Sequence, residues 1–374
     1  MSDQIPLFKI PWDIEDIKNV ADSVGRGGYW AKGPYIEEFE QRVAEYLGVK
    51  HAIAVNSGTS ALMAALKGAD IGDGDEVIVP SFTQQATANA VKMVGGEPVF
   101  ADIERETYGL DPDSVVEQIT EETTAIMPVH VYGSICQIEQ LNAVAADHDL
   151  TVIEDAAEAL GASKKGKMAG TFGDAAGLSF CQNKIVPTGE GGMVITDDDS
   201  IAETASIYCS HGRTTKDYFE TSKSGQHVIV GGNFRMPDIV AALGCSQMEK
   251  IEQLIEGRRA AAQRMNEAFE TMEGITPHSF DGRHVYQFYT VTFDESINRD
   301  RVIEILSENG VSAKVYWDPA VHQSQTYQQN SDEGTLPVTE ETTQRVLSLP
   351  MHPELEATET DRIIDAVKKG INAA

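Results

Sequence analysis

Residues 175–196 read AAGLSFCQNKIVPTGEGGMVIT. The runs at 175–180 and 192–196 are short and apolar, which is typical of buried strands. Lys184 lies in the glycine-rich turn between them. Glycine lets a backbone pass close to a ligand, and a lysine at a strand end can present its amine to a cleft. An amine becomes a nucleophile once it loses its proton, which desolvation or a nearby cation promotes. A solvated loop lysine is the alternative, and the surrounding residues argue against it.

Strand-like and helical runs alternate on the amino-terminal side of this stretch. Five further strands are expected, at 52–56, 77–80, 98–102, 125–129 and 150–154. Helical patterns lie between several of them, at 60–68, 83–94 and 137–148. This alternation predicts an α/β fold with a mainly parallel, seven-stranded sheet covered by helices. Ligands of such sheets bind beyond the carboxyl ends of the strands.

The carboxyl-terminal third has a different organisation. A helical pattern at 237–272 is read as a single long helix that links two domains, with Pro237 suited to its first turn. Beyond it we expect a small α+β domain with the following elements: strands at 285–293 and 312–317, and helices at 300–309, 340–347 and 358–370. The predicted division is a large domain at 1–245 and a small domain at 246–374.

Charge excludes some classes of partner. The 374 residues include 29 basic and 59 acidic side chains, a net charge of −30. Such a surface repels nucleic acid and anionic lipid, so we expect neither as a partner. The acids are scattered along the chain, which favours adaptation to a salty interior where screening removes their repulsion.

The chain carries no sign of export or of a metal site. The amino terminus lacks a signal-peptide pattern, and no apolar run approaches the ~20 residues of a membrane helix. The four cysteines are widely spaced without a CxxC pair, so the sequence predicts neither a disulfide framework nor a metal site. We therefore expect a cytoplasmic protein.

Two acidic residues follow one of the predicted strands, in the segment VIEDAAEALG at 152–161. A carboxylate at the end of a buried strand is costly unless a positive or donating group meets it. A protonated pyridine nitrogen would serve for Asp155, and the carboxylate would keep the ring cationic. A helix N-cap is an equal alternative for Asp155.

A small-residue turn follows the first strand, in the segment NSGTSAL at 56–62. Backbone N–H groups and the helix dipole at such a turn form an anion site. The hydroxyl of Ser179, five residues before Lys184, is a further candidate donor to a phosphate. An ordinary capped helix also explains this segment.

Together these segments make the chain resemble the DegT/DnrJ/StrS sugar aminotransferases, which have the type I fold of pyridoxal-phosphate enzymes. The resemblance runs nearly end to end. It rests on the motifs IPLF at 5–8, GYWAKGP at 28–34, SGT at 57–59, PVHVYG at 128–133, EDAA at 154–157, GEGG at 189–192, NFRM at 233–236 and LSLP at 347–350.

The resemblance implies a role for each matching residue. Lys184 would hold pyridoxal 5′-phosphate as a Schiff base and move the substrate proton, and Asp155 would meet the pyridine nitrogen. The expected phosphate ligands are Thr59, Ser60, Ser179 and, from the other subunit of a homodimer with shared active sites, Asn233. His322 matches a histidine near the substrate, although a solvated loop histidine explains it nearly as well. We interpret His130 as a structural histidine at a strand end.

Two positions depart from the family pattern. Glu158 stands where the family often has a glutamine near the cofactor's phenolic oxygen, and a carboxylate there would have to share a proton. Family members that resemble GDP-perosamine synthase carry glutamate there, which favours GDP-4-keto-6-deoxymannose as substrate and GDP-perosamine as product. Gln84 replaces an aromatic residue that usually stacks on the cofactor ring. The amino donor implied by the resemblance is L-glutamate.

Other functions remain open at this point. The same chemistry could act on a UDP- or dTDP-linked keto sugar or on a keto-inositol. Related sugar 3-dehydratases have histidine in place of the lysine, so Lys184 argues against that class. A non-catalytic regulatory or binding protein is the last alternative, and the presence of both Lys184 and Asp155 argues against it.

Overall fold

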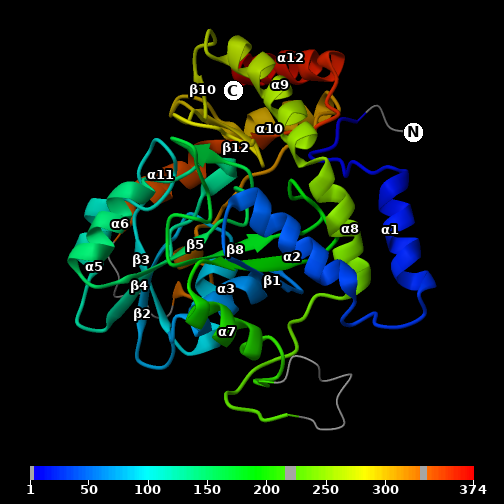
Figure 1. The fold of residues 1–374 in the computed structure, drawn as a ribbon. Helices are drawn as coiled ribbons and strands as arrows, with labels where there is room; N and C mark the ends of the chain where they lie inside the picture. The colour runs from blue at the N-terminus through cyan, green and yellow to red at the C-terminus, as the bar shows by residue number, and fades with distance from the viewer. Residues whose placement is uncertain (1–3, 215–224, 329–334) are drawn as a thin grey trace.

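A seven-stranded sheet forms the centre of the larger part of the molecule (Figure 1). The computed structural model describes residues 4–214, 225–328 and 335–374. In spatial order the strands of the sheet are β1 (His51–Val55), β9 (Gly192–Thr196), β8 (Ala175–Ser179), β5 (Thr151–Asp155), β4 (Thr123–Ile126), β2 (Glu76–Pro80) and β3 (Glu97–Ala101). Only β9 runs antiparallel to its neighbours, so the other six strands are parallel. The predicted α/β class with a mainly parallel sheet is confirmed.

Helices cover both faces of this sheet because successive strand residues point to opposite sides. In β2, Val77 and Val79 belong to one buried cluster and Ile78 to the other. The first cluster is covered by α3 (Gly58–Gly68), α4 (Ala86–Val94) and α7 (Asp199–Tyr208). The second is covered by α2 (Pro34–Leu47), α5 (Pro112–Gln118), α6 (Ile138–Asp147) and α8 (Asp238–Glu249). A short hairpin of β6 (Ser163–Lys164) and β7 (Lys167–Met168) follows β5.

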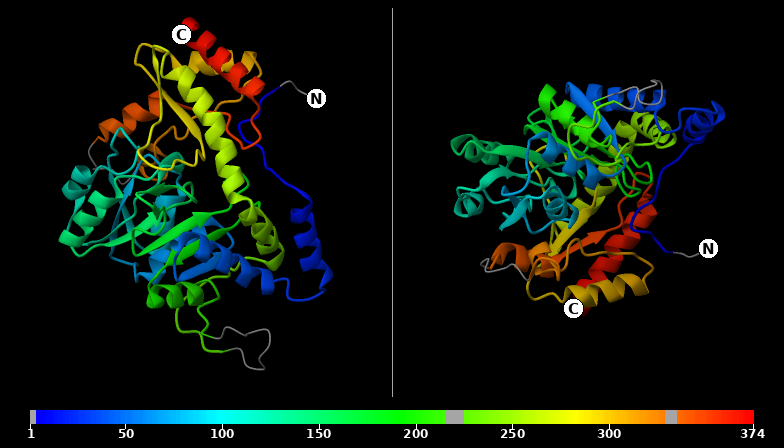
Figure 2. Two further views of the ribbon diagram at one scale, coloured as in Figure 1. Left: turned by 45° about the horizontal axis from the view of Figure 1, so that its top comes forward. Right: turned by 90° about the horizontal axis from the view of Figure 1, so that it is seen from below.

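The predicted single helix at 237–272 is wrong, because the chain forms two helices with a break at Lys250. Helix α8 ends at Glu249, Lys250 has φ −109° and ψ 9°, and α9 runs from Ile251 to Phe269. Helix α8 packs against α1 (Ile14–Gly25) and α2, whereas α9 packs against α12 (Ala357–Ala373) and β10 (Ile275–Pro277) of the smaller part (Figures 1 and 2). The chain must therefore change direction between them. Lys250 is held at the break by Asp13 and Asp16, at 2.7 and 2.8 Å.

The smaller part contains a three-stranded antiparallel sheet in the order β10 (Ile275–Pro277), β11 (Tyr289–Phe293) and β12 (Val346–Leu349). It is accompanied by α10 (Arg299–Glu308), α11 (Pro337–Arg345) and α12 (Ala357–Ala373). The predicted strand at 312–317 is wrong, since only Lys314 pairs there, with Ser348. The predicted helix at 340–347 ends at Arg345 instead, because the apolar run after it is buried as β12 in the core of the smaller part.

The amino-terminal residues pack against this smaller part. Ile5 is buried in its core and pairs with Val311. At the other junction, Ile251 and Ile255 of α9 pack with the large sheet, whereas Ala261 and Ala262 join the smaller core. The predicted domain boundary near residue 245 stays a prediction. Among the described helices, none combines the length and the apolar character needed to cross a bilayer.

His352, just after β12, is a fully buried histidine. It is 0% exposed, and both of its ring nitrogens lack a hydrogen-bond partner among the described residues. Burial, together with nearby cations, lowers the pKa of His352 to about 4. The unfolded chain, in which this pKa is about 6.5, therefore binds more protons than the folded chain below that pH. His352 consequently costs stability as the pH falls from about 6.5 towards 4.

We expect His352→Leu to make the free energy of unfolding less dependent on pH. Between about pH 7 and pH 5, the wild-type chain should lose about 1–2 kcal/mol more unfolding free energy than the variant. Urea denaturation at the two pH values measures this difference. His148→Leu, at an exposed position, is the control and should follow the wild type. An equal pH dependence in wild type and His352→Leu would contradict the prediction.

Candidate active site

The carboxyl ends of the six parallel strands meet at one edge of the large sheet, and the candidate residues lie along this edge. Asn56 follows β1, Ser179 ends β8, Asp155 ends β5 and Ser81 follows β2. Strand β9 starts at the same edge with Gly192, which pairs with Ser179. The loops that leave this edge are therefore close together in space, as predicted for a ligand site of an α/β sheet.

Lys184 points into the protein from the turn between β8 and β9. The turn is closed by a bridge between Cys181 and Gly189, and the Lys184 N–H donates to the carbonyl of Cys181 at 2.9 Å. The Lys184 side chain is only 13% exposed, and its Nζ lies 3.2 Å from Oε1 of Glu158. The ring of Phe288 lies beneath the amine, 5.9 Å from Nζ to the ring centroid. Lys184 is thus not a solvated loop lysine.

Glu158 is buried and held from two sides. Its Oε1 faces Lys184, and its Oε2 accepts a hydrogen bond of 3.0 Å from the backbone N–H of Tyr132. Tyr132 has a positive φ of 58° within the short helix η1 (Val131–Gly133), which directs this N–H towards the carboxylate. Burial raises the pKa of the Glu158 carboxyl, and the charge of Lys184 acts in the opposite direction. This carboxylate is the polar partner of the lysine.

Asp155 lies behind this pair at the end of β5, where it is 5% exposed. Its Oδ2 accepts a hydrogen bond of 2.7 Å from Thr87, and its Oδ1 accepts one of 3.2 Å from the backbone N–H of Ala157. Burial raises the pKa of Asp155, so the carboxylate needs a positive partner to stay ionised. The helix N-cap interpretation is wrong, because the chain after Asp155 forms turns and no helix begins there.

The start of helix α3 lies directly against Ser179. A Cβ built on Gly58 would come within 2.8 Å of the Ser179 Cβ, so only glycine allows this approach. The Ser57 hydroxyl caps α3 by accepting from the Ser60 N–H at 3.1 Å, and the Ser60 hydroxyl donates to Asn56 at 2.7 Å. Thr59 lies half-buried in the same first turn. The segment is therefore both a capped helix and a cluster of donors that includes Ser179.

Three further candidates are held by other partners. Gln84 is exposed before α4, and its Oε1 accepts from the N–H of Gln85 at 2.7 Å. Asn233 is exposed, and its backbone pairs with Ser210. His322 bonds to Ser81 rather than to Lys184. Its ring Nδ1 bonds to the Ser81 hydroxyl, which also accepts from the His322 backbone N–H at 3.0 Å.

His322 lies in the short helix η2 (Val321–Gln323), and its side chain is only 12% exposed. Its Nε2 lies 3.5 Å from Glu340 of α11. Burial lowers the pKa of the ring, and Glu340 partly offsets this effect. The solvated-loop alternative is therefore wrong for His322, whereas its predicted place near the substrate stays a prediction.

His130 has the structural environment that we expected. It is fully buried, its Nδ1 accepts from the N–H of Cys136 at 3.3 Å, and its Nε2 lies 2.6 Å from Glu154. Glu154 also accepts from the backbone N–H groups of Gly170, Phe172 and Gly173. This pair ties the segment after β4 to β5 and leaves neither ring nitrogen free for substrate.

Two residues of the site were missed from the sequence. Thr87 sits in the first turn of α4, and its bond to Asp155 depends on how α4 crosses the sheet. The spacing of Thr83 and Thr87, whose hydroxyls bond at 2.9 Å, was the available signal. Phe288 comes from the smaller part, and no local pattern connects it with Lys184.

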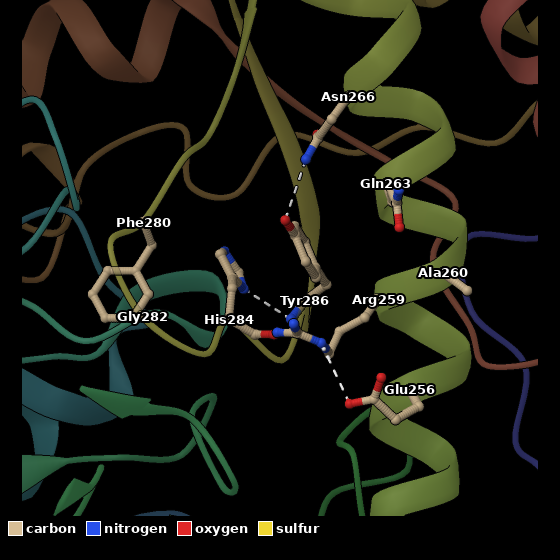
Figure 3. Close-up of a pocket in the computed structure, with 9 residues that line it drawn as sticks. All are labelled: Glu256, Arg259, Ala260, Gln263, Asn266, Phe280, Gly282, His284 and Tyr286. Carbon is tan, nitrogen blue, oxygen red and sulfur yellow. Dashed lines mark hydrogen bonds and ion pairs between the residues drawn. The ribbon is translucent and has the colours of Figure 1, made fainter. Parts of the chain in front are cut away.

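A cavity of about 380 Å³ lies away from this edge (Figure 3). Its walls come from α9 and from residues 280–286: Glu256, Arg259, Ala260, Gln263, Asn266, Phe280, Gly282, His284 and Tyr286. Arg259 in this wall is already paired with Glu256 at 3.4 Å. Because Lys184, Glu158 and Asp155 do not line it, we do not assign the reaction to this cavity.

Comparisons with known proteins agree with the resemblance found in the sequence. A model of the DegT/DnrJ/EryC1/StrS aminotransferase family matches residues 11–368. GDP-perosamine synthase from Caulobacter vibrioides is 40% identical over 340 residues, which cover 90% of each chain. PseC from Helicobacter pylori, an aminotransferase involved in the biosynthesis of pseudoaminic acid, has a TM-score of 0.93 and 30% identity over 100% of both chains. NtdA from Bacillus subtilis with bound cofactor PMP has a TM-score of 0.89 and 27% identity, covering 100% of this chain and 86% of that one.

These matches span nearly the whole chain, and the solved structures share its large mainly parallel sheet and its smaller second part. The type I fold expected from the resemblance is thereby confirmed. The sequence expectation of an enzyme is confirmed as well. The chain belongs to the DegT/DnrJ/EryC1/StrS aminotransferase family, and it is a pyridoxal-phosphate-dependent sugar aminotransferase.

Proposed function

We propose that this enzyme transfers the amino group of L-glutamate to GDP-4-keto-6-deoxymannose and so forms GDP-perosamine. The observation that carries the proposal is the buried contact between Lys184 and Glu158, at 3.2 Å, in a chain 40% identical to a GDP-perosamine synthase. Glutamate at position 158 is the feature that favours this substrate over UDP- and dTDP-linked sugars.

The residues at the sheet edge fit pyridoxal 5′-phosphate. The buried carboxylate of Asp155 suits a protonated pyridine nitrogen, because burial alone raises its pKa and a cation would keep it ionised. The first turn of α3, with Thr59, Ser60 and the adjoining Ser179, suits a phosphate, because helix N-termini favour anions. Lys184 would attach the cofactor through its amine. Gln84, exposed at the start of α4, would lie beside the ring.

When bound, the cofactor supplies an electron sink that stabilises the substrate carbon after it loses a proton. The chain supplies the groups that move and direct that proton. The Lys184 amine would move the proton between the substrate carbon and the cofactor, in one direction for glutamate and in the other for the keto sugar. Glu158 restrains the amine through its carboxylate, and Tyr132 fixes that carboxylate through its N–H. Thr87 keeps Asp155 aligned. Glutamate and the keto sugar use one site in turn, so the kinetics should be ping-pong.

We also propose that two copies of the chain share their active sites. Asn233 is exposed in the single chain, which agrees with a role in the site of a partner. The chain also exposes large apolar side chains just before α1 and on the loop after it: Trp12 at 68%, Tyr29 at 64% and Trp30 at 51%. Apolar groups of this size on a highly charged protein favour an interface. We further propose that His322 lies near the substrate. The proposed location of the enzyme is the cytoplasm, and we propose that its many acidic residues are an adaptation to salt.

Incubation with L-glutamate and a panel of GDP-, UDP- and dTDP-linked keto sugars tests the reaction directly. We expect mass spectrometry to detect amino product from GDP-4-keto-6-deoxymannose at a higher rate than from the other sugars. Lys184→Ala should keep the fold but give no product and no Schiff-base absorbance band with pyridoxal 5′-phosphate. Lys165→Ala, at a side chain 72% exposed, is the matched control and should behave like wild type. Preference for another nucleotide sugar would contradict the proposed substrate. Turnover by Lys184→Ala would contradict the proposed role of the lysine.

Asp155→Asn should still bind the cofactor but should lower kcat about 100- to 10,000-fold, since it removes a charge-assisted hydrogen bond. Thr87→Val leaves the charge of Asp155 in place and removes one hydrogen-bond donor to it, so kcat should fall only about tenfold. Steady-state kinetics at saturating cofactor measure both. A loss below about tenfold for Asp155→Asn would argue against its pairing with the ring.

The shared site can be tested by mixing two impaired variants, Lys184→Ala and Asn233→Ala. If Asn233 serves the partner's site, a mixed dimer has one site with both lesions and one site with neither. Random exchange at equal concentrations makes half of the dimers mixed, so roughly a quarter of all sites should recover. Activity after verified subunit exchange is the measurement. If no activity returned, both residues would belong to the same site of one chain, which would contradict the proposal.

A further inference from the structure

Residues 285–288, here called the strap, run from the smaller part of the protein beneath the lysine site. The Val285 N–H donates to the carbonyl of Gly133 at 2.9 Å, and the Phe288 N–H donates to that of Tyr132 at 3.3 Å. The strap thus lies along the same short segment whose Tyr132 N–H holds Glu158. It also supplies the Phe288 ring beneath the amine of Lys184.

Side chains of the strap contact both parts of the protein. Figure 3 shows the Tyr286 side chain pointing to Asn266 of α9, and the Tyr286 hydroxyl accepts from Asn266 at 3.3 Å. Val285 packs on the large part, where a Cβ on Gly133 would meet its Cγ2 at 2.8 Å. Tyr286 has a positive φ of 49°, so the chain bends there, and the Gln287 side chain reaches the turn that carries Lys184.

The amide of Gln287 holds the peptide bond of the lysine. Gln287 is 1% exposed, and its Nε2 donates to the carbonyl of Asn183 at 2.7 Å. That carbonyl belongs to the same peptide unit as the Lys184 N–H, which donates to Cys181 at 2.9 Å. Both ends of one planar group are therefore held, one by the strap and one by the turn itself. Rotation of this plane would redirect the Lys184 side chain away from Glu158.

The strap is in turn anchored from α9. The guanidinium of Arg258 is 2% exposed and donates to the carbonyls of Tyr286 at 3.2 Å and Gln287 at 3.4 Å. It also donates to the carbonyl of Met351, at 3.3 Å. These bonds fix the backbone from which the Gln287 side chain extends, so the amide is held in place before any ligand binds.

We propose that Gln287, in the smaller part of the protein, is a positioning residue. It orients the Lys184 side chain by hydrogen-bonding to the Asn183–Lys184 peptide. The inference rests on the proposed role of Lys184 in attaching the cofactor. It deepens that role, because the direction of the reactive amine is set by a residue on a different part of the protein. The Gln287 amide bonds to this peptide rather than to the lysine amine, so it acts through Lys184.

Two substitutions separate this role from simple packing. Gln287→Leu keeps most of the volume and removes the donor. Gln287→Glu keeps the shape, and its carboxyl donates to the Asn183 carbonyl only while it is protonated. Gln247→Leu is the matched control, because Gln247 is also 1% exposed and its Nε2 also donates to a backbone carbonyl, that of Pro11 at 3.0 Å. Gln247 ties α8 to the amino-terminal segment.

The readout is the rate at which the absorbance band of the Schiff base with Lys184 appears when pyridoxal 5′-phosphate is added to the cofactor-free full-length chain. Gln287→Leu should slow this rate about tenfold at every pH, the factor that loss of about 1.4 kcal/mol produces. Gln287→Glu should approach the wild-type rate at low pH and fall behind as the new carboxyl ionises. Gln247→Leu should stay within about twofold of wild type, although its melting temperature falls.

Equal slowing by Gln287→Leu and Gln247→Leu would overturn the proposal, since the effect would then follow stability alone. A Gln287→Glu profile parallel to that of Gln287→Leu would overturn it too. If the wild type forms no Schiff-base band, the proposed function fails instead. The positioning role is then read from reductive methylation of Lys184 relative to Lys165 in the cofactor-free chain. Only the Gln287 variants should change that ratio, and an unchanged ratio would reject the inference.

Discussion

Burial of charge at one edge of the large sheet is the constraint on which the site depends. Lys184, Glu158 and Asp155 are all nearly removed from solvent, where an unpaired charge is costly. The protein meets this cost with specific donors: the N–H of Tyr132 for Glu158, and Thr87 with the N–H of Ala157 for Asp155. Each donor comes from a different segment of the chain, so these segments must keep their positions for the charges to stay buried.

The sheet provides that order because six of its strands point the same way. Their carboxyl ends bring together residues as distant in sequence as Asn56, Asp155 and Ser179. Close approach between the first turn of α3 and the end of β8 requires glycine at position 58. The donors around Ser179 therefore follow from backbone packing, and they do not depend on a ligand to assemble them.

The smaller part of the protein contributes to the same site from outside the sheet. Phe288 lies beneath the lysine amine, and Gln287 bonds to the peptide before it. Arg258 on α9 anchors this strap. Because α9 also packs against the large sheet through Ile251 and Ile255, both parts are joined by one helix as well as by the strap. The geometry of Lys184 thus depends on contacts from both parts.

The sequence by itself determined the features that depend on neighbouring residues. Apolar runs predicted all seven strands of the sheet, the glycine-rich turn pointed to Lys184, and acids at a strand end pointed to Asp155. Only the tertiary structure decided what these residues touch. Glu158 as the partner of Lys184, Thr87 as the donor to Asp155, and the strap with Gln287 join segments far apart in the chain. The break at Lys250 and strand β12 were likewise decided by packing. Local patterns encode burial and periodicity, whereas contacts between distant segments depend on how whole elements pack, which no short stretch of sequence contains.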